Sequence, residues 1–169
     1  MFNIVLLNPE IPSNTGNIGR TCIITGASLH LIRPLGFMIN DKTLKRAGLD
    51  YWDRLGAMEH LDLEHFYSYY EKSVSENKPK IYYATTKARK RYTDVHFNPG
   101  DYIMFGPESA GIPEEVLVEH PDECIRIPML PEERSLNLSN SVAIIIYEAL
   151  RQNDFKGLES KGDLHRLKW

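Results

Sequence analysis

Short, mostly apolar runs alternate with longer mixed segments along most of this chain. Apolar runs of four or five residues predict buried strands, and the longer segments between them predict helices. Strands that alternate with helices predict an α/β fold with a mainly parallel sheet and helices on both faces. The predicted strands cover residues 4–7, 28–32, 80–84, 102–105 and 124–127, and the predicted helices cover residues 15–25 (capped by Asn14 or Thr15), 41–46, 61–73, a segment beginning at Pro113, and 140–152.

The length and the continuity of this pattern indicate one domain. A chain of 169 residues suits one domain with its own core, and no linker-like segment interrupts residues 1–152. We therefore expect a single domain over residues 1–153. Residues 154–169 are polar and charged, with scattered leucines and a tryptophan, and predict a loosely held tail.

Composition favours a cytoplasmic protein. Cys22 and Cys124 are the only cysteines, so no disulfide framework is expected, which fits a reducing compartment. The N-terminus lacks the charged start and apolar core of a signal peptide. No apolar run approaches the roughly 20 residues that a membrane span requires. We expect no contact with a membrane.

Charge restricts how the protein could bind nucleic acid. A net charge of -3 and a pI near 6.1 exclude a basic field over the whole molecule, so binding would need local patches. One basic cluster contains Lys42, Lys45 and Arg46, and a second contains Lys87 and Arg89, followed by two more cations. Taken alone, each cluster is more simply a solvated surface. They become candidate RNA contacts only if other features indicate an RNA substrate.

Three polar loops follow predicted strands and precede predicted helices. They occupy residues 8–20, 105–113 and 134–143, and they are rich in Asn, Ser, Gly and Pro. The third runs directly into an apolar helix, so it presents short polar side chains and the unpaired N–H groups of a helix start. Ligands of parallel sheets bind beyond the carboxyl ends of the strands, where such loops converge. The sequence therefore predicts a site for a polar small molecule at this edge.

Common cofactor and metal motifs are missing from the sequence. It has no G-x-x-x-x-G-K-[ST] phosphate loop, and residues 16–19 lack the full G-x-G-x-x-G spacing of a dinucleotide fold. Ser109 lies near glycines but not in a G-x-S-x-G elbow, which weakens a hydrolase interpretation. The histidines are scattered, and His60 and His65 are expected on different faces of a helix. No metal site is therefore expected.

The polar loops carry a specific resemblance. The stretches that carry it are N-x-G-N-x-x-R at 14–20, F-G-P-E-x-x-G-I-P at 105–113, I-P-M at 127–129, R-S-L-N-L-S-N-S-V-A at 134–143, and two further segments at 7–20 and 46–51. Together they resemble the three motifs of the SPOUT methyltransferases. The short length and the segments at 7–20 and 46–51 resemble one family within that class, the small tRNA (cytidine/uridine wobble ribose) 2′-O-methyltransferases. The resemblance covers roughly residues 1–152, with every motif in order.

This resemblance implies features that spacing alone does not show. It implies a deep trefoil knot at the C-terminal end of the α/β fold, a feature that general topology rules argue against. It implies S-adenosylmethionine as the cofactor and the tRNA anticodon loop as the substrate. It also implies a homodimer, which we expect to form through the last helix.

Six residues are candidate contacts for S-adenosylmethionine. The resemblance assigns Ala84, Gly106, Ile127 and Ser135 to the cofactor. Gly106 allows close approach of the backbone, because it has no side chain. Apolar walls are expected from Ile127 and from two further residues, Met129 and Leu136. Taken singly, each glycine or proline could merely form a tight turn, but the set together favours a ligand site.

Four residues are candidates for catalysis. Arg20 matches the family's motif arginine. A guanidinium does not lose its proton in proteins, so we expect Arg20 to bind a phosphate and stabilise oxyanion charge. Glu108 is expected to orient Arg20 or the nucleotide, or else to cap a helix. Asn137 matches the third-motif asparagine and is expected to order the cofactor loop, or else to form a local turn. Tyr147 is expected at the dimer interface, where the family has a functional tyrosine, or else in the core.

The leading hypothesis is therefore methyl transfer to the ribose 2′-OH of the wobble nucleotide in tRNA. One alternative is the same chemistry on another RNA. The other is a non-catalytic RNA-binding protein with the same fold, against which the intact Arg20, Gly106, Ser135 and Asn137 argue. The sequence does not identify the tRNA species or distinguish cytidine from uridine.

Overall fold

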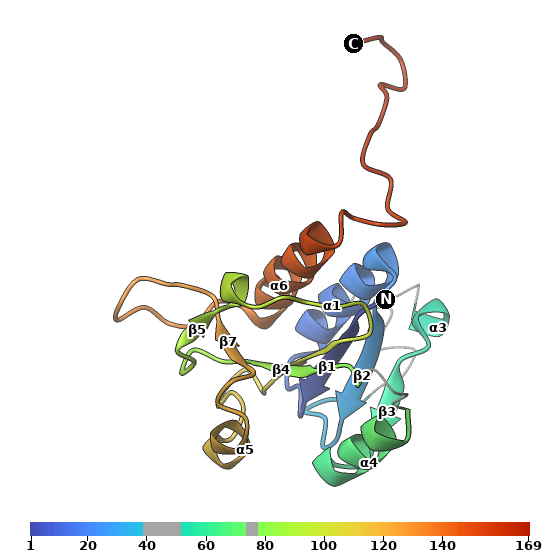
Figure 1. Cartoon of the computed structure of the whole chain (residues 1–169). Coiled ribbons are helices and arrows are strands. Elements are labelled where there is room, and N and C mark those ends of the chain that lie inside the picture. The colour runs from blue at the N-terminus through green and yellow to red at the C-terminus, as the bar shows by residue number, and fades with distance from the viewer. Residues whose placement is uncertain (39–51, 74–77) are drawn as a thin grey trace.

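A computed structural model of the protein describes residues 1–38, 52–73 and 78–169 (Figure 1). Its centre is a seven-stranded sheet in the order β3-β2-β1-β6-β4-β7-β5, and every pairing in the sheet is parallel. The predicted α/β class is confirmed. The elements are β1 (Asn3–Leu7), α1 (Pro12–Thr25), β2 (Ser28–Ile32), α3 (Trp52–Leu55), β3 (Met58–His60), α4 (Leu63–Ser73), β4 (Ile81–Ala84), β5 (Lys90–Arg91), the 3-10 turn η1 (Tyr92–Asp94), β6 (Tyr102–Phe105), α5 (Glu114–Glu119), β7 (Cys124–Arg126) and α6 (Leu138–Gln152).

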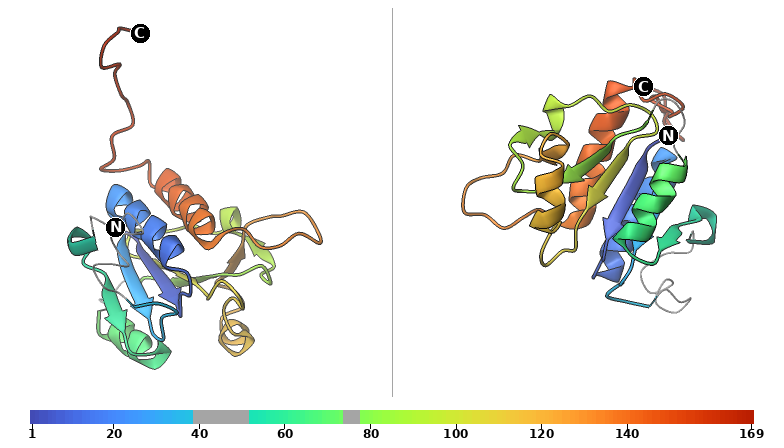
Figure 2. Two further views of the ribbon diagram at one scale, coloured as in Figure 1. Left: turned by 180° about the vertical axis from the view of Figure 1, so that it is seen from behind. Right: turned by 60° about the horizontal axis from the view of Figure 1, so that its bottom comes forward.

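Helices cover both faces of the sheet. Helices α1 and α6 pack side by side on one face, and α4 and α5 lie on the other (Figures 1 and 2). Successive side chains of a strand point to opposite faces. In β1, Ile4 and Leu6 enter the core shared with α1 and α6, while Val5 and Leu7 enter the core shared with α4. Burial on both faces explains the nearly continuous apolar run of this strand.

The strand predictions hold within one residue at each end, whereas the helix starts differ more. Helix α1 begins at Pro12 rather than residue 15, so Asn14 and Thr15 lie inside the helix and do not cap it. Helix α6 begins at Leu138 rather than residue 140, because the Asn137 side chain caps it. Its Oδ1 accepts the N–H of the residue two positions on, at 2.9 Å. The helix predicted for residues 41–46 lies outside the described residues.

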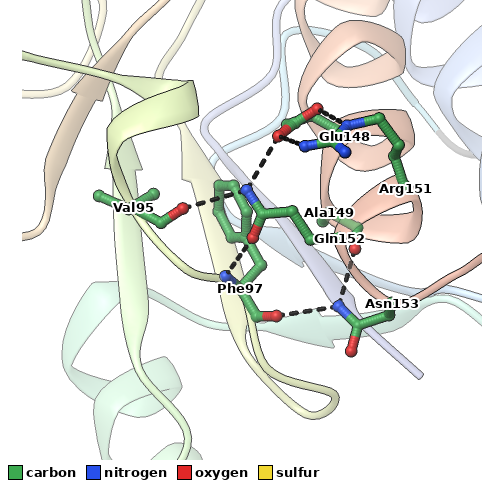
Figure 3. A network of polar contacts seen from close by, with 7 residues as sticks. All are labelled: Val95, Phe97, Glu148, Ala149, Arg151, Gln152 and Asn153. Atoms are coloured by element: carbon green, nitrogen blue, oxygen red, sulfur yellow. Dashed lines mark hydrogen bonds and ion pairs between the residues drawn. The ribbon is translucent and has the colours of Figure 1, made fainter.

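The last turn of α6 is fixed to the segment before β6 by a polar network (Figure 3). Gln152 donates through Nε2 to the Val95 carbonyl at 3.0 Å and accepts the N–H of Phe97 through Oε1 at 2.9 Å. Asn153 donates to the Phe97 carbonyl at 2.9 Å. The Phe97 ring is fully buried against Tyr82. These contacts anchor the C-terminal end of α6 to a segment more than 50 residues earlier in the chain.

Replacing Gln152 with alanine is expected to destabilise the fold by about 2 kcal/mol. The change leaves the Phe97 N–H and the Val95 carbonyl without this partner, and an unsatisfied buried polar group costs roughly 1–3 kcal/mol. Urea unfolding measures the loss. The neighbouring control Arg151→Ala removes an exposed guanidinium, and its partner Glu148 keeps the hydrogen bond from Gln152, so the change should cost much less. Equal losses in the two variants would contradict this account.

A buried histidine pair links β2 to β3. His30 Nδ1 lies 3.0 Å from His60 Nε2, and both rings contact Phe66 and Tyr69 of α4. His60 lies on strand β3, whereas His65 lies on helix α4. The expectation that the two histidines share a helix is therefore wrong. Burial, and then the neighbouring His60, lowers the pKa of His30 to about 4, and burial also lowers the pKa of His60. The pair is thus held in its neutral form.

Acidification is expected to destabilise the protein through His30. An unfolded histidine takes up its proton near pH 6.5, whereas the folded His30 resists protonation down to about pH 4. The unfolded state binds more protons in this window. Stability is therefore full above pH 6.5 and falls by up to about 3 kcal/mol as the pH drops to 4.

Urea unfolding at fixed protein concentration between pH 7 and pH 4 measures this slope. It should flatten in His30→Leu and persist in His165→Gln, which changes an exposed histidine in the tail. A His30→Leu variant with the wild-type slope would show that other groups dominate the acid response.

The chain after α6 leaves the body in two stages. Phe155 and Leu158 still pack against the core of α1 and α6. Residues 159–169 are exposed and extend away from the domain (Figures 1 and 2). Within the described parts of the chain, no helix is long and apolar enough to cross a membrane.

Candidate functional site

The carboxyl ends of β4, β6 and β7, together with the start of α1, border one cavity of about 390 Å³. This volume lies within the range of small-molecule sites. Its apolar lining includes Phe105, Ile125 and Ile145, and its polar lining comes from loops. The bordering segments are residues 84–87, residues 105–112, the loop after β7 and the first turns of α1 and α6. The cavity therefore lies where the polar loops of the sequence were expected to converge.

The loop after β6 folds tightly along one wall of the cavity. A Cβ atom on Gly106 would fall 2.2 Å from the Gly111 carbonyl carbon and 2.2 Å from the Ile112 nitrogen. Gly111 has a φ of 71°, a backbone conformation that favours glycine, and its N–H donates to the Pro107 carbonyl at 2.8 Å. The two glycines thus allow the chain to return on itself, and the wall of the cavity is largely main chain.

The rest of the cavity lining includes the ends of β4 and β7 and the loop that leads into α6. Thr85 donates its N–H to the Ile125 carbonyl at 2.9 Å, which continues the sheet pairing past Ala84. Ser135 and Leu136 line the cavity from the loop before α6. The helix start lies at the cavity as well, where Ser141 belongs to the lining. The first N–H groups of a helix carry partial positive charge, which favours a carboxylate nearby.

A chain of side-chain hydrogen bonds connects the three loops. Glu108 accepts from Asn14 Nδ2 at 2.9 Å, and Asn14 Oδ1 accepts from Asn137 Nδ2 at 2.9 Å. Asn137 in turn caps α6. Glu108 also accepts the N–H groups of Glu10 and Ile11, at 2.8 and 3.3 Å, so it satisfies free donors at the start of α1. Glu108 and Asn137 therefore orient the walls of the site through Asn14.

The structure brings most of the predicted site residues together. All six candidate cofactor residues line the cavity, as do Glu108 and Asn137. Their contacts with a bound cofactor stay a prediction. Sequence reasoning missed Asn14, Thr85 and Thr86, which also line it. Asn14 belongs to the first motif, so its position there was a usable signal, whereas neither threonine stands out in the sequence.

Arg20 and Tyr147 do not line the cavity. Arg20 lies on the exposed face of α1 with Ile24, which is 58% exposed. Tyr147 lies on the exposed face of α6 with Ile144, and these side chains are 44% and 36% exposed. Helices α1 and α6 pack against each other, and we call the exposed side of this pair, with Arg20, Ile24, Ile144 and Tyr147, the α1–α6 face.

The candidate RNA-binding cations have different surroundings. Lys87 lines the cavity and pairs with Glu114 at 2.9 Å. Arg89 is exposed, and no ion pair to it occurs within the described ranges. The two cations that follow it pair with acidic residues. Lys42, Lys45 and Arg46 lie outside the described residues.

Comparison with known proteins identifies the family of this chain. The SpoU rRNA Methylase family matches the chain over residues 1–147. The chain belongs to this family. A tRNA (cytidine(34)-2'-O)-methyltransferase from Photorhabdus asymbiotica is 49% identical to this SpoU methylase over 158 residues, which are 93% of this chain and 97% of that protein.

Solved structures agree with the sequence match. A crystal structure from Bacillus anthracis superimposes on this SpoU methylase with a TM-score of 0.86 at 45% identity, covering 96% of this chain and 100% of that one. A second structure, reported for the 2-OH methylation of C/U34 on tRNA, has a TM-score of 0.82 at 40% identity, covering 92% of this chain and 98% of that one. The predicted family is confirmed.

Proposed function

We propose that this protein methylates the ribose 2′-OH of nucleotide 34, a cytidine or uridine, in the anticodon loop of tRNA. The observation that carries the proposal is the 49% identity, over 93% of the chain, to a tRNA (cytidine(34)-2'-O)-methyltransferase. The family match spans residues 1–147 and so includes every segment that borders the cavity. An unstacked loop nucleotide is also the RNA target that proteins read most easily.

S-adenosylmethionine supplies the reactive methyl group, on a positively charged sulfur. The residues present fit such a molecule, which needs apolar walls, main-chain groups for its adenine and donors for its ribose and carboxylate. Ile127, Met129 and Leu136 provide apolar walls, and Ser135 provides a hydroxyl. The main-chain wall at Gly106 has no room for a side chain. We assign these residues, with Ala84, to cofactor binding.

The chain's own residues align the reactants and stabilise charge. Alignment of two reactants supplies up to about 7–11 kcal/mol in ideal cases. Glu108 and Asn137 hold the loops in place through Asn14 and so position the cofactor wall against α1. Arg20 binds the phosphate next to the target ribose and stabilises the negative charge that develops on the 2′ oxygen. For this role, Arg20 on the α1–α6 face and a cofactor cavity must both reach the same nucleotide.

A homodimer through the α1–α6 face meets this requirement. Pairing two copies would cover Ile24, Ile144 and Tyr147, and it would bring Arg20 of one copy toward the cavity of the other. Large apolar side chains exposed together on one face are typical of an interaction surface. We assign Lys87 and Arg89 as contacts for tRNA phosphates, together with Lys42, Lys45 and Arg46 of the segment outside the described residues.

Replacing Ile144 with aspartate is expected to convert the dimer into a folded monomer that lacks methyl transfer activity. A buried, unpaired carboxylate at an apolar interface is strongly unfavourable. Sedimentation velocity measures the oligomeric state. The matched control is Val118→Asp, because Val118 is 73% exposed on α5, on the opposite face of the sheet. A monomeric wild type, or a dimeric Ile144→Asp, would contradict this interface.

The remaining expectations belong to the same proposal. We retain residues 1–153 as the catalytic domain and residues 154–169 as a tail. The knot is retained as a feature that the family implies, and the support for it is the family match over residues 1–147. A cytoplasmic location is supported by two cysteines that are both free and buried.

The function is tested by incubating the protein with total tRNA and methyl-labelled S-adenosylmethionine, followed by mapping of the label. We expect 2′-O-methylation at position 34 of a subset of tRNAs. A parallel incubation with ribosomal RNA in which that RNA, and not tRNA, takes up label would overturn the tRNA target and support the same chemistry on another RNA. Tight tRNA binding without any label, despite cofactor binding in calorimetry, would identify a non-catalytic RNA-binding protein and overturn the proposal.

A further inference from the structure

The loops after β1 and β6 are joined by a reciprocal exchange of hydrogen bonds between two glutamates. Glu108 accepts the main-chain N–H of Glu10 at 2.8 Å. In return, Glu10 Oε2 accepts the main-chain N–H of Ser109 at 2.9 Å, and its Oε1 accepts the Ser109 hydroxyl at 2.7 Å. Each carboxylate thus holds the main chain of the opposite loop. The Ser109 contacts favour the charged form of Glu10 and lower the pKa of that carboxyl.

The exchange holds the tip of the loop that forms the cavity wall. Residues 107–110 all line the cavity, whereas Glu10 does not. Within the described residues, the hydrogen bonds that join this tip to other elements all lead to residues 10–14. The only internal bond of the loop in that part of the chain closes its base, from Gly111 to Pro107. Three of these bonds are made by the Glu108 side chain, and the two that hold Ser109 are made by the Glu10 carboxylate.

The main chain around Glu10 is also held by the loop after β2. Gly36, in the loop after β2, donates its N–H to the Pro9 carbonyl at 2.9 Å. A Cβ atom on Gly36 would lie 2.7 Å from Glu10 Cα, so the two main chains touch. The loops after β2, β1 and β6 are therefore stacked in the same order as their strands in the sheet. This packing gives the Glu10 carboxylate a fixed base from which to hold Ser109.

We infer that Glu10 is a positioning residue for methyl transfer, which acts through Ser109 to hold the loop at residues 106–111 in its cofactor-binding shape. The inference rests on the proposed function, because it takes the cavity as the S-adenosylmethionine site. Glu10 does not touch the cavity, so it acts on the cofactor only through the wall. Its loss therefore weakens cofactor binding and leaves the α1–α6 face and Arg20 intact.

The test compares Glu10→Gln with wild type. Glutamine keeps the size of the side chain but has one acceptor oxygen and no charge, so it cannot satisfy both Ser109 donors equally well. We expect the calorimetric Kd and the KM for S-adenosylmethionine to rise about tenfold. The kcat at saturating cofactor, the KM for tRNA and the melting temperature should stay close to wild type. The matched control is Glu71→Gln, which removes an exposed glutamate paired with Lys78 on α4, away from the cavity.

Ser109 variants separate this exchange from a general structural effect. Ser109→Ala should weaken cofactor binding as Glu10→Gln does, and Ser109→Thr, which keeps the hydroxyl, should restore it. Because both changes affect the hydroxyl contact, and Ser109→Ala leaves the main-chain contact in place, the double variant Glu10→Gln/Ser109→Ala should lose less than the sum of the two single variants. Fully additive losses, or a loss of tRNA binding equal to the loss of cofactor binding, would overturn the inference.

The two proposals fail in different ways. If the wild type binds no S-adenosylmethionine in calorimetry, the proposed function is overturned, and this inference with it. If the wild type binds the cofactor and Glu10→Gln binds it equally well, only the positioning role of Glu10 is overturned.

Discussion

Replacing Gly106 with alanine is expected to lower methyl transfer by about 100-fold or more. The added Cβ would lie 2.2 Å from main-chain atoms of Gly111 and Ile112, so the loop at the cavity wall must move. Main chain cannot rotate aside as a flexible side chain does. A displacement of about 1 Å in a positioning element can cost a factor of about 100 in rate. The loss should appear first as weaker S-adenosylmethionine binding, measured by calorimetry.

The control for this prediction is Gly162→Ala in the exposed tail, where a Cβ would meet no atom within 4 Å. It should bind the cofactor like the wild type. Thermal unfolding of both variants separates a local change at the wall from a loss of the fold. A Gly106→Ala variant with wild-type affinity and rate would show that the cofactor does not lie against this wall.

Replacing Arg20 with alanine is expected to lower kcat by roughly 100- to 1,000-fold, the usual cost of removing one donor that stabilises a developing oxyanion. Cofactor binding should be unchanged, because Arg20 does not line the cavity. Arg20→Lys should recover only part of the rate, since lysine keeps the charge but lacks the planar fork of donors. Steady-state kinetics with tRNA measure both variants. Full activity in Arg20→Lys would argue against an essential guanidinium.

The same variant also tests whether Arg20 serves the cavity of the other subunit. Arg20→Ala keeps an intact cavity, and Gly106→Ala keeps an intact arginine. If Arg20 acts across the α1–α6 face, mixed dimers of the two inactive variants should regain one working site each. Random mixing gives half mixed dimers, so activity should recover to roughly a quarter of wild type. No recovery in verified mixed dimers would place Arg20 with its own cavity.

The strands could be predicted from sequence because both faces of the central strands are buried. β1 and β6 are apolar at nearly every position, and this signal does not depend on distant contacts. The edge strands β3 and β5 have three and two residues, too few to show any periodicity. The start of α1 was predicted too late, because its free N–H donors are satisfied by Glu108 from a distant loop. No local pattern contains that information.

The cavity residues were predictable for a related reason. Motif residues such as Gly106, Ser135 and Asn137 follow strands whose carboxyl ends meet at one edge, so topology and resemblance indicate the same place. The contacts between the motifs were not predictable. Glu10 and Ser109 are 99 positions apart in sequence and carry ordinary polar side chains. Their pairing follows from the sheet order, which places β1 beside β6.

The position of helix α6, between the cavity and the α1–α6 face, affects how the proposed dimer responds to dilution. Its 15 residues form a rod about 22 Å long, with Ser141 and Ile145 at the cavity and Ile144 and Tyr147 on the outer surface. A rigid rod cannot shift on one side without shifting on the other. A ligand that binds the dimer more tightly than the monomer shifts the equilibrium toward the dimer by mass action. In the proposed homodimer, α6 links the cofactor cavity to the interface, so added S-adenosylmethionine should raise the dimer fraction at nanomolar protein concentrations.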